Sequence, residues 1–287
     1  MARMLLGVDI GGTNMKIASF DAETYEIVRS EIVPTEAEKG FPDVLSRVIA
    51  LVENYRTPDV SSVGICVPGP VRQPEGLLLR APNIPKSENI RVLDLAQSAL
   101  KMPVFLGNDA QCFALAEAVL GAGKNHKVVC GVTIGTGVGG GLVIDGNIYQ
   151  GAHGFAAEVG HMLLRPGEPP FETRDKRGEV EQFFSGSAFA ERCKAAASPD
   201  DYLHGEACSF LHPDIFREIA WMCTNLSHAY DPSIIVFGGT TGKALKPHLE
   251  AIAKELKTWM LPSVPIPLLA IAKRQHPGTL GAALLSR

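Results

Sequence analysis

One pattern occurs twice in the sequence, and this duplication constrains the fold more than any other feature. An apolar segment at residues 4–10 breaks at Gly11-Gly12-Thr13 and resumes at 15–20, which is typical of two strands around a tight turn. A second apolar segment at 127–134 breaks at Gly135-Thr-Gly-Val-Gly-Gly-Gly141 and returns at 142–144. A hairpin that restarts near the middle of a chain predicts two similar halves.

Strands and helices alternate after each predicted hairpin. The expected strands are 25–33, 60–67, 104–106, 234–237 and 267–271, and the expected helices are 41–55, 93–100, 109–120, 182–194, 213–230, 243–259 and 278–285. The polar stretch 165–178 predicts a surface loop. This order is typical of an α/β protein. With 287 residues, 46% of them hydrophobic, the chain can form two lobes, predicted at 1–115 (joined by the C-terminal helix 276–287) and 116–275.

Composition argues against several classes of protein. The net charge of -4 comes from 27 basic and 31 acidic residues without a basic block, so we expect no nucleic-acid partner. The sequence has no signal-peptide pattern and no apolar run of membrane-spanning length, so we expect a cytoplasmic protein without a membrane partner. Six cysteines lack C-x-x-C spacing and are expected to be reduced, buried thiols, with no disulfide framework or cysteine metal site.

Three glycine-rich turns follow apolar strands, at 9–13, 134–141 and 236–241. Glycine lets backbone N–H groups approach an anion, and threonine hydroxyls add donors, which suits phosphate oxygens. Any one turn could equally be a hairpin or a strand exit. Three together favour a nucleotide, although none matches the P-loop or dinucleotide-binding patterns.

Several polar residues stand where they could meet a substrate. Asn108-Asp109 ends one predicted strand and begins an Ala-rich helix, a place where a carboxylate faces a cleft, although a helix N-cap is the alternative. Glu158 and His161 are three residues apart and would share one face of a helix. Glu181 follows the polar loop.

Taken together, these motifs resemble the ROK family of bacterial sugar kinases and repressors, within the actin and hexokinase superfamily. The resemblance spans nearly the whole chain. It is carried by Asp9-Ile-Gly-Gly-Thr13, Pro82-Asn83-Ile84-Pro85, Asn108-Asp109-Ala110, residues 134–141, Gly151-Ala-His-Gly154 with Glu158 and His161, Gly178 with Glu181 and Ser185-Gly186, and Asp231-Pro232 with Gly238-Gly239. It implies two actin-like (ribonuclease H-like) lobes with a cleft between them, and transfer of a phosphoryl group from ATP to a sugar.

The resemblance also implies a role for each matching residue. Asp109 would be the base that accepts the proton of the sugar hydroxyl. The other sugar contacts would be Asn83, Asn108, Glu158, His161 and Glu181, with a neutral His161 donating from one ring nitrogen while a neighbour orients the other. The nucleotide would be held by Asp9, Gly11, Gly12, Thr13, Gly135, Thr136, Gly137, Gly139, Gly238 and Gly239. Mg²⁺ would arrive with ATP, with Asp9 as an outer-shell contact.

One segment departs from the family pattern. Many members bind a structural zinc with a histidine and three cysteines in a C-x-C-G-x-x-G-C-x-E run. Here the cysteine positions hold Glu172, Arg174 and Glu179. Because zinc needs a well-spaced set of thiolate and imidazole ligands, we predict no structural zinc.

Alternatives to a kinase come from the same family. A repressor would carry a helix-turn-helix before the first glycine turn, which here begins at residue 11, so the kinase is favoured. A non-catalytic sugar or nucleotide sensor stays open. For the substrate, an N-acetylhexosamine (N-acetylglucosamine or N-acetylmannosamine), phosphorylated on its 6-hydroxyl, ranks above a hexose such as glucose or fructose. The resemblance also suggests a homodimer.

Overall fold

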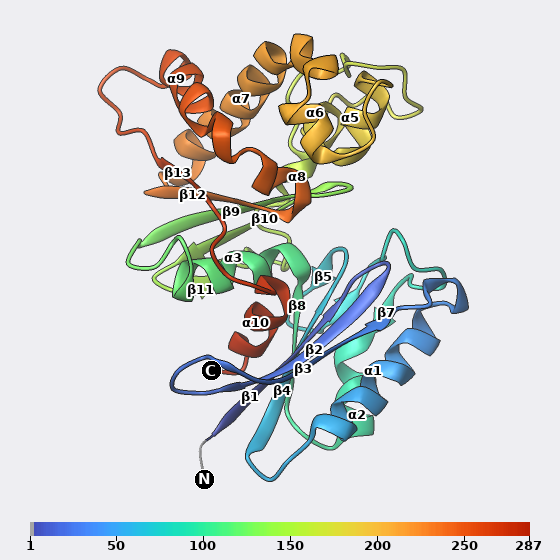
Figure 1. The fold of residues 1–287 in the computed structure, drawn as a ribbon. Coiled ribbons are helices and arrows are strands. Elements are labelled where there is room, and N and C mark those ends of the chain that lie inside the picture. Colours follow the sequence, from blue (N-terminus) through green and yellow to red (C-terminus); the bar gives the residue numbers. More distant parts are fainter. Residues whose placement is uncertain (1–2) are drawn as a thin grey trace. The chain divides into compact units, whose positions relative to one another are not determined.

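The computed structural model describes residues 3–287, and the contacts within the chain divide them into two units (Figure 1). The first unit comprises residues up to 116 together with 149–156 and 275–287, and the second comprises 117–148 and 157–274. The segment 149–156 thus groups with the first unit, whereas the sequence-based division assigned it to the second lobe.

The first unit is built on a five-stranded sheet. Its strand order is β3-β2-β1-β4-β8, in which β1 to β3 are antiparallel neighbours and β1, β4 and β8 run parallel. The strands are β1 (Met4–Ile10), β2 (Asn14–Asp21), β3 (Ile27–Pro34), β4 (Val60–Val67) and β8 (Val104–Asn108). A small sheet joins β5 (Val71–Arg72), β6 (Leu77–Leu78) and β7 (Ile90–Arg91).

Helices cover both faces of this sheet (Figure 1). Residues alternate along β4 because successive side chains of a strand point to opposite faces. Val63 and Ile65 pack in the cluster formed with α1 (Phe41–Tyr55) and α2 (Val92–Leu100), while Cys66 packs with Ala282 of α10 (Pro277–Leu284). The short helix η1 (Ala37–Lys39) precedes α1, and α3 (Asp109–Leu120) follows β8.

The second unit repeats the strand order of the first. Its sheet is β11-β10-β9-β12-β13, again with antiparallel pairs followed by parallel strands. The strands are β9 (Val128–Ile134), β10 (Val138–Ile144), β11 (Asn147–Ile148), β12 (Ile234–Gly238) and β13 (Leu268–Ile271). The prediction of two similar halves is therefore confirmed.

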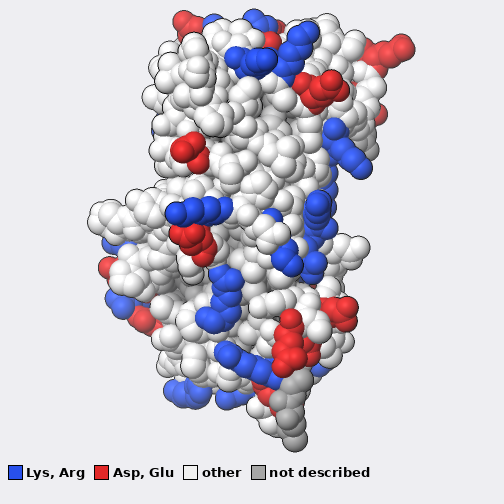
Figure 2. All heavy atoms as spheres, turned by 90° about the vertical axis from the view of Figure 1, so that its left-hand side faces the viewer, with Lys and Arg blue, Asp and Glu red and all other residues white. Residues whose placement is uncertain are grey.

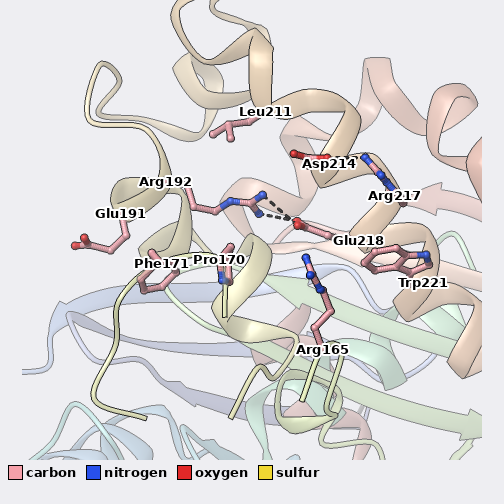
Figure 3. A pocket seen from close by; sticks show the side chains of 10 residues that line it. All are labelled: Arg165, Pro170, Phe171, Glu191, Arg192, Leu211, Asp214, Arg217, Glu218 and Trp221. Carbon is pink, nitrogen blue, oxygen red and sulfur yellow. Dashed lines mark hydrogen bonds and ion pairs between the residues drawn. The ribbon is translucent and has the colours of Figure 1, made fainter. Parts of the chain in front are cut away.

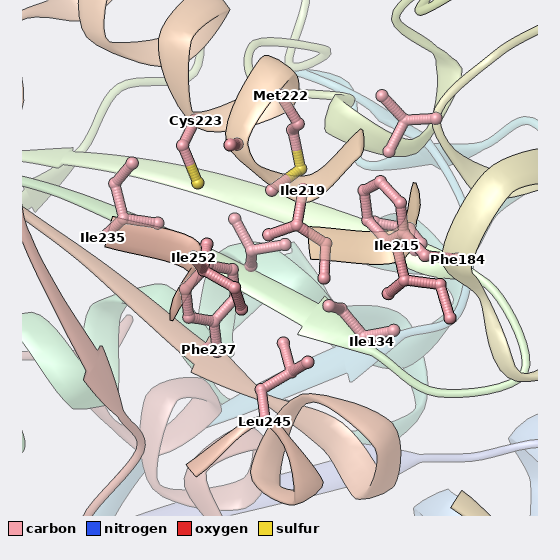
Figure 4. Packing of buried hydrophobic residues seen from close by; sticks show 14 of the residues in the cluster. Ile134, Phe184, Ile215, Ile219, Met222, Cys223, Ile235, Phe237, Leu245 and Ile252 are labelled. Atoms are coloured by element: carbon pink, nitrogen blue, oxygen red, sulfur yellow. The ribbon is translucent and has the colours of Figure 1, made fainter. Parts of the chain in front are cut away.

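Helices of the second unit pack on this sheet through one large apolar cluster (Figure 4). Ile219 of α7 and Ile252 of α9 meet Phe237 of β12 there, all fully buried. The helical elements are η2 (Val159–His161), α4 (Glu181–Phe184), α5 (Gly186–Arg192), α6 (Pro199–His204), η3 (Glu206–Leu211), α7 (His212–Tyr230), α8 (Gly239–Ala244), η4 (Lys246–His248) and α9 (Leu249–Trp259).

Two expected helices are each divided. The helix expected at 182–194 breaks at Ser185, whose hydroxyl accepts the Ala188 N–H at 3.0 Å and starts a new helix as its N-cap. The helix expected at 243–259 breaks at η4, where Pro247 lacks the N–H that a helix interior requires.

The expectation of six reduced cysteines is wrong for one pair. Cys193 at the end of α5 and Cys208 in η3 form a disulfide with a Cα–Cα distance of 6.0 Å. The intervening chain, including α6, folds back to bring the two together, which a spacing of 15 residues does not reveal. Cys66, Cys112, Cys130 and Cys223 are buried thiols, as expected.

Two surface properties bear on partners. Within residues 3–287, no helix combines the length and the apolar character needed to cross a membrane. On the face shown in Figure 2, basic and acidic side chains are interspersed.

Candidate functional site

Three parallel strands of the first unit end at one edge of the sheet, and two of the predicted carboxylates lie there. Asp9 of β1 is in register with Cys66 of β4, and Cys66 is in register with Gly107, directly before Asn108-Asp109. The pKa of the Cys66 thiol is raised well above its ordinary value, first by a hydrogen bond with Cys112 and by burial, and then by neighbouring negative charges that include both Asp9 and Asp109. The predicted base and the predicted nucleotide carboxylate therefore flank β4.

Asp109 is the first residue of α3, and Asn108 fixes this start. The Asn108 amide oxygen accepts the N–H groups of Ala110 at 2.9 Å and Gln111 at 3.2 Å, and its amide nitrogen donates to the Gly69 carbonyl at 3.0 Å. The N-cap interpretation thus accounts for Asn108, and its sugar contact stays a prediction.

Asp9 contacts both β4 and α10. The Cys66 thiol donates to its Oδ1 at 3.3 Å, and removal from water raises the pKa of Asp9, opposed by that hydrogen bond and by the charges of Lys16 and His276. A Cβ on Gly278 of α10 would lie 2.6 Å from Asp9 Oδ2, so the carboxylate reaches the start of that helix. This arrangement suits an outer-shell contact to a cation that arrives with a phosphate ligand.

The first glycine turn is braced by a residue that sequence reasoning missed. Thr35 is fully buried; its N–H donates to the Thr13 carbonyl at 2.8 Å and its hydroxyl to the Gly11 carbonyl at 2.6 Å. Gly12 packs against Asn83, since a Cβ there would be 3.3 Å from the Asn83 Cβ. The structure therefore brings together two sequence-predicted segments, the turn at 11–13 and the loop that carries Asn83.

The Gly151-Ala-His-Gly154 motif is attached to the first unit by two glutamines. Gln111 Nε2 donates to the Gly154 carbonyl at 3.0 Å, and the Gln73 N–H donates to the His153 carbonyl at 3.0 Å. Sequence reasoning found neither contact. Gln111 follows Asp109 by two positions, and this closeness in sequence is the one feature that could have pointed to Gln111 as a site residue.

In the second unit, the glycine turn is shorter than predicted. Only residues 135–137 lie between β9 and β10, and Gly139 is paired with Thr133 inside the sheet. The start of α5 fixes the turn, because Gly186 donates to the Gly135 carbonyl at 2.7 Å and Ser187 to that of Thr136 at 3.2 Å. No atom would lie within 4 Å of a Cβ on Gly135, so this side of the turn is open.

Glu181 is tied to the same turn. Its Oε2 accepts the Val138 N–H at 2.8 Å, and a Cβ on Gly137 would lie 2.2 Å from that oxygen. Sequence reasoning assigned Glu181 to the sugar alone. The structure gives it a positioning role on the glycine turn, and the sugar contact stays a prediction.

The third glycine segment joins this turn. Gly238 pairs with Thr133 at the end of β12, and Gly239 has a φ of 77° and lies so close to the Ile134 carbonyl that a Cβ would be 2.3 Å away. The Thr241 hydroxyl is buried there without a hydrogen-bond partner, 3.7 Å from where a Cβ on Gly186 would stand. Clustered glycines and an unsatisfied hydroxyl donor fit an anionic ligand such as a nucleotide phosphate.

Glu158 precedes the single turn η2 as its N-cap, and His161 is the last residue of that turn. Their sharing of one helical face stays a prediction. The turn packs against β10, where a Cβ on Gly160 would lie 2.0 Å from the Val138 carbonyl. Burial raises the pKa of Glu158, and the His161 charge partly opposes this. His161 Nδ1 lies 3.2 Å from Glu179 Oε2.

The positions that correspond to zinc cysteines do not form a zinc site. The Glu172 side chain is 95% exposed beside Lys176, Arg174 is a cation, and Glu179 pairs with Arg177 at 3.3 Å as well as with His161. Across residues 3–287, no cluster of three or more His, Cys, Asp or Glu side chains could hold a metal ion. These residues do not fit zinc, and its absence from the protein stays a prediction.

A separate cavity of about 380 Å³ lies in the second unit (Figure 3). None of the predicted site residues lines it. Four of its charged side chains form two ion pairs: Arg192 contacts Glu218 at 2.6 Å, both nearly buried, and Arg217 contacts Asp214 at 2.5 Å. Because these charges cancel, we interpret the cluster as a structural ion-pair network.

The chain superposes over nearly its whole length on solved structures of an actin-like α/β fold. A ROK hexokinase from Thermus thermophilus gives a TM-score of 0.85 at 27% identity, covering 98% of this chain and 97% of that one. A ROK family glucokinase from Streptomyces griseus, in complex with glucose and AMPPNP, gives 0.77 at 28% identity, covering 98% of each. The fold is therefore that of the actin-like sugar kinases.

Sequence comparison gives the family. The ROK family model matches residues 5–287. The N-acetyl-D-glucosamine kinase of Pectobacterium atrosepticum is 32% identical over 310 residues, covering 98% of both chains. The chain belongs to the ROK family.

Proposed function

We propose that this ROK-family sugar kinase transfers the γ-phosphoryl group of ATP to the 6-hydroxyl of an N-acetylhexosamine, with Asp109 as the base. One observation carries the proposal: the carboxyl edge of β1, β4 and β8 bears both Asp109 at the start of a helix and Asp9 beside the first glycine turn. The edge thus has a base for a hydroxyl and a carboxylate suited to a nucleotide.

Phosphoryl transfer from ATP to a sugar requires no covalent bond between the protein and either substrate. Asp109 accepts the proton of the sugar hydroxyl while the hydroxyl oxygen forms a bond to the γ-phosphorus of ATP. The bond between the γ-phosphorus and the oxygen that bridges it to the β-phosphate breaks, which releases ADP. Mg²⁺ bound with ATP would neutralise phosphate charge. The protein mainly positions the reactants, which accounts for the rigid bracing of each glycine turn.

The nucleotide is assigned to the residues of the glycine turns. In the first unit these are Asp9 and residues 11–13. In the second they are residues 135–137 and 238–239, supported by the unpaired Thr241 hydroxyl and the open side of Gly135. Gly139 then acts as a strand residue that supports the turn.

The sugar is assigned to Asn83, Asn108, Glu158, His161 and Glu181. Carboxylates accept from pairs of hydroxyls, which suits a polyol. An N-acetylhexosamine, either N-acetylglucosamine or N-acetylmannosamine, is preferred because one relative that matches over nearly the full chain is an N-acetyl-D-glucosamine kinase. Glucose and fructose are the hexose alternatives, and the glucokinase structure supports glucose among them.

The direct test is release of ADP from ATP with Mg²⁺ across N-acetylglucosamine, N-acetylmannosamine, glucose, fructose, mannose, allose and a β-glucoside. We expect strong stimulation by one N-acetylhexosamine. A preference for glucose or fructose would contradict the proposed N-acetylhexosamine substrate but would still support the proposed kinase activity. If no sugar stimulates ADP release although sugar still binds, the non-catalytic sensor would be favoured instead.

We also propose that the protein acts in the cytoplasm, where ATP is supplied, and as a homodimer. Large apolar side chains at the end of α9 and beyond remain exposed in the second unit, with Trp259 at 43%, Leu261 at 60% and Leu268 at 56%. Such residues are typical of surfaces that associate. Light scattering coupled to size exclusion should give about twice the chain mass, and a monomer at micromolar concentration would contradict the dimer.

A further inference from the structure

Glu179 stands at a position where the family pattern places a zinc-binding cysteine, and it contacts a predicted sugar ligand. We propose that Glu179 is a positioning residue that holds the His161 ring in one tautomer and orientation, so that His161 presents a hydrogen-bond acceptor to the sugar without help from a metal. The part of this inference that concerns the sugar rests on the function proposed above; the part that concerns the ring does not.

The geometry joins a fixed carboxylate to an accessible ring. Glu179 Oε2 lies 3.2 Å from His161 Nδ1. The Glu179 side chain is 10% exposed, whereas that of His161 is 53% exposed. A buried anchor therefore holds one side of an imidazole whose other side can meet a ligand.

Glu179 is itself immobilised by its backbone. It forms an antiparallel bridge with Leu163, and the next residue, Val180, donates to the Met162 carbonyl at 2.9 Å. Gln182 Oε1 accepts the N–H groups of Gly178 at 2.8 Å and Glu179 at 3.2 Å. These contacts also fix the end of the 165–178 loop.

Arg177 completes the arrangement from the loop. Its Nη1 lies 3.3 Å from the same Glu179 oxygen. A guanidinium can only donate hydrogen bonds, so the Glu179 oxygen that it contacts acts as an acceptor.

The acceptor character of Glu179 determines the state of the ring. Since the carboxylate only accepts, Nδ1 of His161 must carry the hydrogen. A neutral imidazole has one N–H, so Nε2 is left as an acceptor. The expectation that the ring donates to the sugar is thereby revised: the ring donates to Glu179, and a sugar hydroxyl donates to Nε2.

Nuclear magnetic resonance of [¹⁵N]histidine-labelled protein tests the tautomer without any substrate. Long-range ¹H–¹⁵N correlations near pH 8.5, where free imidazole is neutral, distinguish the two forms. With 8 histidines in the chain, His161→Asn assigns the signal. We expect wild type to show the Nδ1–H form and Glu179→Leu to shift toward Nε2–H. An Nε2–H form in wild type would overturn the proposal, whether or not the variant folds.

Kinetics test the consequence for the sugar. Glu179→Leu should raise the sugar KM about tenfold with kcat changed by less than about twofold, the scale of one lost hydrogen bond. Glu179→Gln retains an accepting oxygen and should restore most of the affinity. Glu168→Gln is the control, because Glu168 lies in the same loop and pairs with Arg165 at 2.7 Å.

Two results would contradict the proposal in this second experiment. One is an unchanged KM in Glu179→Leu, and the other is an equal effect of Glu168→Gln. Stoichiometric zinc in purified, untagged protein would also overturn it. If no sugar supports turnover in wild type, the proposed function fails, while the tautomer measurement still decides the role of Glu179.

Discussion

At the scale of single residues, Glu158 combines two opposing requirements. Burial raises its pKa, so the fold disfavours its ionised form, yet binding of sugar hydroxyls is better served by a carboxylate. Because the folded-state pKa lies above the unfolded one, the folded protein binds this proton more tightly. The resulting loss of stability appears as pH rises through the folded-state pKa and is complete above it.

Glu158→Gln should therefore stabilise the protein while it weakens sugar binding. We expect the melting temperature near pH 8 to rise by roughly 1–3 °C, with a smaller difference near pH 4, where more of the wild-type carboxyl is protonated. Thermal melts at the two pH values measure this, with the exposed Glu26→Gln as control. A lower melting temperature at pH 8 would show that the charge is stabilised by contacts of its own.

The structural position of a site residue could be predicted from the sequence where its side chain has a single role. The sequence placed Asp109 correctly at the start of a helix, because strand and helix signals meet there. It did not separate Asn108 from Asp109, because a capping amide and a sugar-binding amide have the same residue type. The double role of Glu181 and the brace at Thr35 depend on contacts between distant segments, which no local pattern encodes.

At the scale of elements, α10 packs unusually closely on the first sheet. A Cβ on Gly64 of β4 would lie 1.7 Å from the Ala282 carbonyl, and one on Gly281 would lie 1.8 Å from the Cys112 carbonyl. Backbone therefore meets backbone on both sides of the helix, which leaves no space for a side chain at either position.

Gly64→Ala should be strongly destabilising for this reason. We expect a loss of about 3 kcal/mol or more in the free energy of unfolding, typical of severe overpacking. Urea denaturation measures it, with Ser61→Ala at an exposed position of the same strand as control. A loss below about 1 kcal/mol would mean that α10 can shift away from the sheet at little cost.

Glu117 is a second element-scale feature, since its buried carboxylate joins two segments of the second unit. It accepts N–H groups from Ala122 at 2.8 Å, Lys273 at 3.0 Å and Arg274 at 2.7 Å. These are the segments where the chain enters and leaves that unit.

Glu117→Leu would leave three N–H groups without acceptors. We expect at least about 3 kcal/mol of destabilisation, and a smaller loss in Glu117→Gln, which keeps one accepting oxygen. Hydrogen exchange should show faster exchange at residues 122 and 273–274 in the leucine variant. Unchanged exchange at these amides would remove Glu117 from this role.

Most elements were predictable from hydrophobic periodicity, and the errors have identifiable causes. The divided helices reflect a capping serine and a proline inside otherwise helical patterns. Gly139 to Gly141 were assigned to a turn, although pairing with β9 keeps them in a strand, because neighbouring strands can override a weak local preference.

At the scale of the whole molecule, the two sheets share one strand order, and each bears glycine turns at its edge. A duplicated hairpin predicted this, because a repeated pattern requires a repeated fold. The pairing of Cys193 with Cys208 was not predictable, because it depends on how a chain of irregular short helices returns to itself.

The disulfide gives a whole-molecule prediction. Protein purified without reductant and then denatured should expose four reactive thiols, from Cys66, Cys112, Cys130 and Cys223, and six after reduction. Thiol titration under both conditions checks this. Six thiols before reduction would mean that this pair is reduced in the isolated protein, as a reducing compartment would favour.

The central claim is that Asp109 is the base of a sugar kinase, and the most direct test is Asp109→Asn assayed for turnover and for sugar binding. The account predicts that ADP release falls by about a thousandfold or more, while calorimetry gives a sugar dissociation constant within about threefold of wild type. Near-normal turnover in this variant would contradict the assignment.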